Sequence, residues 1–131
     1  MEKNLGVVRF LLCIGIVLFL LWFLLFSFAP EKLLTAMQAF ESPGLYLRLY
    51  GVFPLSWAIL FLFALKDVEK NVAIIKAGIM TGFLTAISLL VVRFVFKVTG
   101  WFNWVSLIIL VIVSLLLWIY LPKKAAQQAT P

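Results

Sequence analysis

The stretch LFLFALKDVEKNVAIIKAGIMTG, Leu60 to Gly82, joins two apolar runs through a short polar segment. Four of the six residues in 66–71 are charged, whereas the only charged residue in the run that follows, up to Gly82, is Lys76. Asp67 is suited to cap the helix that follows, because Asp favours helix starts. So short a connection predicts an antiparallel hairpin of two apolar helices.

The composition of the whole chain explains why such helices need lipid around them. Of its 131 residues, 66% are hydrophobic and only 12% are charged, and the mean hydropathy is +1.20. Soluble domains carry roughly twice that share of charged residues. A soluble domain of this size could not bury so much apolar surface, so the sequence predicts a membrane protein.

Four apolar runs are long enough to cross a hydrocarbon core of about 30 Å at 1.5 Å per residue. We therefore predict an all-α integral membrane four-helix bundle, built as a single domain over residues 1–121. A short interfacial helix is expected between the first two spans, and a disordered cytoplasmic tail after the last one. The expected spans cover about residues 6–29, 43–65, 72–96 and 101–121, the interfacial helix about 31–40 and the tail 122–131.

The first run has a rival interpretation as a secretory signal peptide. MEKNLGVVR is a basic leading segment, and SFA at Ser27 to Ala29 has the small-x-small form of a cleavage site. However, the run exceeds the usual apolar core of about 7–15 residues, and Pro30 would directly follow the cut. We expect the first span to be retained. Its removal would leave three spans.

The net charge of +6 is spread over the ends of the apolar runs instead of forming one patch. This distribution favours orientation signals and contact with anionic membrane lipid over nucleic acid. Seven cations are expected on the side of the termini and four on the other, which predicts both termini in the cytoplasm of a bacterial-type cytoplasmic membrane. The two sets are Lys3, Arg9, Lys66, Lys70, Lys76, Lys123 and Lys124, and Lys32, Arg48, Arg93 and Lys97.

Missing residue types exclude several chemistries. The chain has no histidine and a single cysteine, Cys13, so it cannot alone build a bis-histidine haem site, a Ser-His-Asp triad or an intramolecular disulfide. All five carboxylates fall at or outside the expected span ends. We expect no enzyme activity, no cofactor and no metal site. Small four-helix drug/proton exchangers rely on a carboxylate in their first helix, which this chain lacks, so a small oligomeric transporter is a weaker alternative.

A layer of polar residues is expected near the non-cytoplasmic face. Arg48, Arg93 and Asn103 each lie within about 8 Å of a predicted span end, and Tyr50 flanks Arg48. The two arginines could extend outward to the lipid headgroups. Alternatively they could face the bundle interior and form a cationic site for an anionic headgroup, a quinone carbonyl or an acidic partner segment.

Other residues are expected to shape the helices. Pro54 lacks the N–H that would bond to the carbonyl of Tyr50, which predicts a kink in the second span or, alternatively, a broken-helix site. Small residues in the third span favour close helix packing, and hydroxyls there are expected to bond to the backbone or to a neighbouring helix. The small residues are Gly78, Gly82 and Ala86, and the hydroxyls are those of Thr81, Thr85 and Ser88.

The segment LRLYGVFPLSWAILFLFALKDVEKNVAIIKAGIMTGFL, residues 47–84, combines an arginine and a glycine three apart, a short charged turn and a helix with small residues. It resembles the DoxX-like and BphX-like group of small four-span bacterial membrane proteins, with Arg48 and Gly51 matching best. The resemblance implies a four-helix bundle. Some members of the group are associated with quinone-linked oxidation of sulfur compounds, so a redox role here would need a partner subunit or quinone.

Taken together, the sequence predicts a multi-pass membrane protein that acts as a non-catalytic accessory subunit, binding a protein partner or a second copy of itself. The first alternative is a binder of quinone or lipid at the layer of Arg48 and Arg93, with Tyr50 and Asn103 beside them. The second is the transporter.

Overall fold

The computed structural model describes residues 2–36, 50–96 and 100–121, and within these segments all regular secondary structure is helical. The helices are α1 (Glu2–Phe28), α2 (Glu31–Ala36), α4 (Val52–Lys66), α5 (Val72–Phe96) and α6 (Trp101–Tyr120). The all-α prediction is confirmed for this part of the chain. Arg48, residues 37–40 of the expected interfacial helix, residues 43–49 of the expected second span and the expected tail lie outside the described residues.

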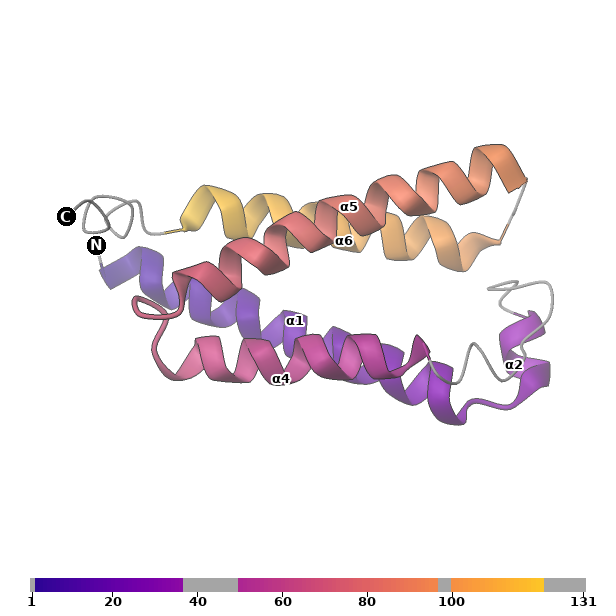
Figure 1. The fold of residues 1–131 in the computed structure, drawn as a ribbon, viewed down its shortest axis with the longest axis horizontal. Helices are drawn as coiled ribbons and strands as arrows, with labels where there is room; N and C mark the ends of the chain where they lie inside the picture. The colour runs from indigo at the N-terminus through magenta and orange to yellow at the C-terminus, as the bar shows by residue number, and fades with distance from the viewer. Residues whose placement is uncertain (1, 37–49, 97–99, 122–131) are drawn as a thin grey trace.

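The long helices form two antiparallel pairs that lie side by side (Figure 1). α1 packs mainly against α4, and α5 packs mainly against α6, while α1 with α6 and α4 with α5 form smaller contacts. We call one end of this bundle the turn end, because it holds the α4–α5 turn, the start of α1 and the end of α6. The opposite end, with the end of α1 and the start of α6, is the α2 end.

The core is centred on Phe61 of α4, whose side chain is only 3% exposed. Its ring lies between two glycines from different helices. A methyl group on Gly15 of α1 would come within 2.9 Å of the ring, and one on Gly78 of α5 within 2.5 Å. The absence of side chains at these two positions lets a large aromatic ring fill the space between the two pairs. Phe19 and Trp57 complete the contact with edge-to-face rings at 5.6 and 5.8 Å.

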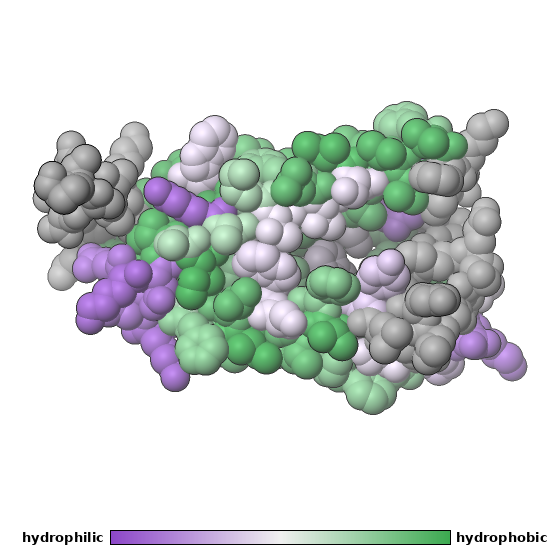
Figure 2. All heavy atoms as spheres, in the orientation of Figure 1, coloured by the Kyte–Doolittle hydropathy of each residue, from purple (hydrophilic) through white to green (hydrophobic). Residues whose placement is uncertain are grey.

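The outside of the bundle is apolar along most of its length. Large hydrophobic side chains remain exposed on all four long helices, among them Phe10, Phe63, Phe94 and Trp118. In Figure 2, apolar residues cover much of the visible face, and polar residues gather mainly at the turn end. Three helices are long and apolar enough to cross a membrane, over Asn4–Phe28, Val72–Val95 and Trp101–Tyr120. The described part of the protein therefore has the character of a membrane protein.

α4 is the shorter apolar helix, at 15 residues. Pro54, expected near the middle of a span, lies in the first turn of the described helix α4. The N–H groups of a first helical turn have no carbonyl of their own helix to bond to, so proline is tolerated there. Backbone bonding resumes at Leu55, whose N–H donates to the Gly51 carbonyl over 3.4 Å. The expected kink involves the chain before residue 50 and lies partly outside the described residues.

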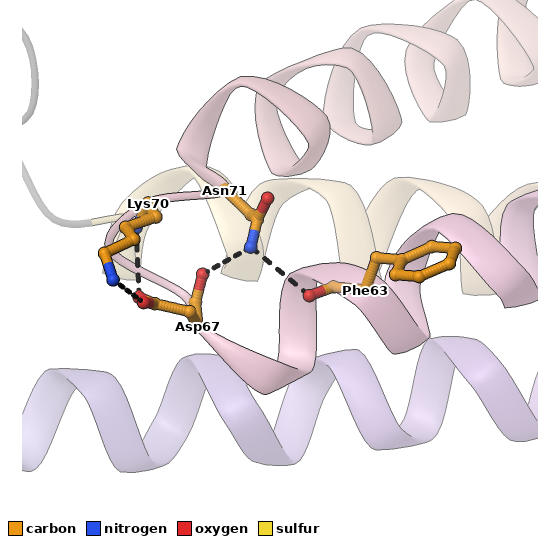
Figure 3. A network of polar contacts seen from close by, with 4 residues as sticks. All are labelled: Phe63, Asp67, Lys70 and Asn71. Carbon is orange, nitrogen blue, oxygen red and sulfur yellow. Dashed lines mark hydrogen bonds and ion pairs between the residues drawn. The ribbon is translucent and has the colours of Figure 1, made fainter.

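The turn between α4 and α5 is held by its own side chains (Figure 3). Asn71 Nδ2 donates to the carbonyls of Phe63 and Asp67, at 3.3 and 2.8 Å, and so satisfies a carbonyl near the end of α4. Asp67 accepts from the Lys70 N–H at 3.2 Å and pairs with the Lys70 ammonium at 3.1 Å. These bonds, above all that from the Lys70 N–H, hold the pKa of the Asp67 carboxyl below its usual range.

Candidate functional site

The α2 end of the α5–α6 pair brings an arginine against an aromatic ring. Arg93 lies in the last turn of α5, and its guanidinium carbon is 4.3 Å from the centroid of the Trp104 ring in the first turn of α6. Such a cation–π contact contributes about 0.5–1 kcal/mol at exposed sites and about 2 when water is excluded. The contact fixes the direction of a positively charged side chain that is half-buried.

Asn103, the residue before Trp104, turns its side chain into the bundle and is 8% exposed. The same face of α6 continues with Ser106 and Ser114, which are also buried. Spacings of three and eight residues place the three polar side chains in one row along the helix. α6 therefore presents a polar row toward the interior of a protein whose outer surface is apolar.

The other two predicted site residues do not join this arrangement in the described structure. Tyr50 is 58% exposed, and its ring stacks on Phe53 of α4 with the centroids 6.0 Å apart. Arg48 lies outside the described residues. Of the predicted polar layer, Arg93 and Asn103 lie at the same end of the bundle, Arg93 over the Trp104 ring and Asn103 buried one residue earlier, whereas Tyr50 is exposed on the outside of the bundle.

The small residues of α5 contact two different helices. Gly78 faces Phe61 and Trp57 of α4, whereas Gly82 faces Ser114 of α6. Ala86, one turn further, is buried as well. Both glycines are therefore occupied by contacts within the chain, so their surface is not free to dock a separate partner.

Sequence reasoning missed Ser106 and Ser114 and pointed instead to hydroxyls of α5. There, Thr85 and Ser88 are exposed, and Ser88 donates to the Leu84 carbonyl at 2.9 Å. The row on α6 could have been predicted from the spacing of its residues, because Asn103, Ser106 and Ser114 share one helical face with Leu110 and Leu117.

In the described segments, no three His, Cys, Asp or Glu residues lie close enough together to hold a metal ion. The candidate site is the polar and cationic α2 end of α5 and α6, made of Arg93, Trp104, Asn103 and Ser106.

Comparison with protein-family models, with curated proteins and with solved structures finds no match for this chain.

Proposed function

We propose that this chain is a four-span membrane protein that works as a non-catalytic accessory subunit and contacts its partner through its apolar outer surface. The observation that carries the proposal is the contrast between the closed interior and the exposed exterior. Phe61, between Gly15 and Gly78, fills the interior in the half of the bundle nearer the turn end, while large apolar side chains remain exposed on every long helix. A filled interior also makes the transporter the weaker alternative.

The fourth span would consist of α4 together with the residues before it. The 15 residues of α4 span only about 22 Å, whereas the predicted span over residues 43–65 would measure about 34 Å as a helix. The exposed apolar surface of α4, including Phe53 and Phe63, supports its placement in lipid. With four spans and the larger number of cations on their side, both termini would lie in the cytoplasm.

Accessibility of single cysteines tests the fourth span and the orientation together. In a Cys13→Ser background, Lys32→Cys and Lys70→Cys lie on either side of that span. An impermeant maleimide added to intact bacterial cells should modify Lys32→Cys, and it should modify Lys70→Cys only after the membrane is permeabilised. Equal modification of both residues in intact cells would show that α4 does not cross the membrane.

The accessory role requires a specific contact on the outer surface. Photo-reactive residues placed at exposed Phe10, Phe63, Phe94 and Trp118, one on each long helix, would be activated in native membranes. At least one of them should form a discrete cross-linked product, either with a single other protein or with a second copy of the chain. The buried Phe61 position is the matched control and should yield no such product. A protein that cross-links only to lipid at all four positions, and stays monomeric in mild detergent, would refute the role.

A second candidate function is the binding of a quinone or an anionic lipid near Arg48 and Arg93. The contact of Arg93 with Trp104 beside the buried Asn103 favours it, because charge and hydrogen-bonding groups are placed together at the level expected for headgroups. A short-chain quinone and phosphatidylglycerol should each be tested for raising the thermal unfolding midpoint. The ligand should still raise the midpoint of the control variant Lys32→Gln. It should no longer raise that of the double variant Arg48→Gln/Arg93→Gln. Equal protection in both variants would rule this site out.

A further inference from the structure

The serine hydroxyls of the described helices differ in their hydrogen bonding. Ser56 and Ser88, which are exposed, donate to the carbonyl four residues earlier in their own helix, each at 2.9 Å. Ser114 is only 4% exposed, and among the described residues its hydroxyl has no hydrogen-bond partner, not even on its own helix. The Ser114 oxygen is still accessible to a molecule of the size of water, because no fully buried side-chain nitrogen or oxygen in the described residues lacks a hydrogen-bond partner. At this depth lipid offers the hydroxyl no hydrogen bond, so a water molecule is the partner that can reach it.

The hydroxyl of Ser114 is directed toward a gap in the neighbouring helix. A methyl group on Gly82 of α5 would collide with Ser114 Oγ and would lie 3.9 Å from the carbonyl oxygen of Leu110. The missing side chain of Gly82 thus makes room for the Ser114 oxygen itself, which packs against the backbone of α5 close to the Leu110 carbonyl. The Leu110 carbonyl can accept a second hydrogen bond, because a carbonyl oxygen has two lone pairs.

A small cavity that is partly open to the outside of the bundle lies at the same place. Its volume is about 30 Å³, and Ser114, Gly82 and Leu110 line it together with Phe61, Gly78 and Trp22. Its size decides which ligand can enter. A cavity needs roughly 10–15 Å³ to hold one water molecule, whose share of liquid volume is about 30 Å³, so one water fits. A quinone ring or a lipid headgroup does not, and the cavity is therefore distinct from the site considered at Arg93.

We propose that a single water molecule occupies the cavity between Ser114 and Gly82, accepting or donating a hydrogen bond at Ser114 Oγ and donating one to the Leu110 carbonyl. Two polar partners are the minimum that ordered buried waters have. The water completes the contact between α5 and α6 at a depth where lipid offers no hydrogen bonds. This inference does not depend on the accessory role, because it concerns only the packing of these two helices.

Water-edited solid-state NMR of the full chain in lipid bilayers tests the proposal. Magnetisation transferred from water should reach Gly82 and Ser114 several-fold faster than Ala58, which is buried in apolar surroundings. Ser114→Ala should remove this fast transfer at Gly82. Ser88→Ala, which deletes a hydroxyl already bonded to its own helix, should leave it unchanged. Transfer to wild-type Gly82 as slow as that to Ala58 would overturn the proposal.

Xenon binding gives an independent readout that needs no variant. Small apolar cavities without water bind xenon, whereas a cavity occupied by a hydrogen-bonded water does not. Xenon added to the wild-type protein should therefore leave the Gly82 and Phe61 resonances unshifted. Saturable shifts at both residues would show a dry cavity and would overturn the proposal, even if Ser114→Ala fails to fold.

Discussion

At the turn end of the bundle, Leu12 of α1, Ile75 of α5 and Leu117 of α6 are almost completely buried together with Phe61. At the α2 end, the buried residues of α6 include Asn103 and Ser106, and the nearby aromatic residues Phe23 and Phe26 of α1 are only partly buried. Among the described residues, the four long helices thus make an apolar core at one end, whereas at the other end α6 turns buried polar side chains inward beside Phe102.

The two ends of the bundle therefore differ in the kind of contact that their side chains make. The turn end has the features that hold helices together in lipid, namely close contacts at glycines and a turn bonded by its own side chains. The α2 end has the features from which a binding site can be made, a cation on an aromatic ring and buried amide and hydroxyl groups. Stability should therefore depend mainly on the turn end, and this expectation can be tested by changes of the same kind at both ends.

Removal of a buried aromatic ring should have the largest effect. Phe61→Ala should lower the free energy of unfolding by about 3 kcal/mol, because the cavity between Gly15 and Gly78 cannot collapse without moving two helix backbones. Phe102→Ala, which removes a ring 6.2 Å from that of Phe26 at the α2 end, should cost about half as much. Unfolding by SDS, followed through tryptophan fluorescence, gives both values. Equal costs would contradict the difference between the two ends.

Filling a glycine gap should have the next largest effect. Gly78→Ala places a methyl group 2.5 Å from the Phe61 ring, which cannot move aside because Gly15 confines its other face. Such overpacking costs about 1–3 kcal/mol, measured by the same unfolding assay. Gly6→Ala is the matched control, because it meets nothing within 4 Å and should be neutral or stabilise the helix by up to about 1 kcal/mol. Similar results for the two variants would show that Phe61 is less constrained than the packing indicates.

The general architecture was predictable from the sequence because its signals are local. Long apolar runs indicate helices whatever their neighbours are, and the short charged segment before Val72 fixes where α5 begins. The all-helical class and three membrane-length helices are confirmed for the described residues. The fourth span remains a prediction, because the described part of α4 is shorter than a membrane-crossing helix.

Which helix faces meet could not be predicted, for a physical reason. In a soluble helix the buried face is marked by apolar periodicity, but here lipid and core are equally apolar, so the mark is weak. The position of Phe61 between two glycines follows from three helices together and has no local signal. Hydroxyls are equally ambiguous, since Ser88 on the outside and Ser114 on the inside look alike in sequence and differ only in their partners.

The α4–α5 turn should contribute a smaller part of the stability of the turn end. Asn71→Ala removes two hydrogen bonds from one amide group, including the bond to the Phe63 carbonyl. We expect a loss of about 1 kcal/mol in the SDS unfolding assay, the usual contribution of such a bond. Asn4→Ala, at an exposed position near the start of α1, should have no measurable effect. If both substitutions are neutral, the hairpin is held by helix packing alone.

The charge of Asp67 should have the smallest effect, and its pH dependence has a defined sign. The pKa of this carboxyl is lowered in the folded protein, chiefly by the Lys70 N–H, from an ordinary value of 3.8. Ionised Asp67 therefore adds stability above the unfolded pKa, and this contribution is lost as the pH falls through the lower folded pKa. The thermal midpoint of the wild type should exceed that of Asp67→Asn slightly at pH 6, and the two should converge as the pH falls below 3.8. A difference that stays constant over this range would mean that the capping geometry, and not the charge, is what Asp67 contributes to the turn.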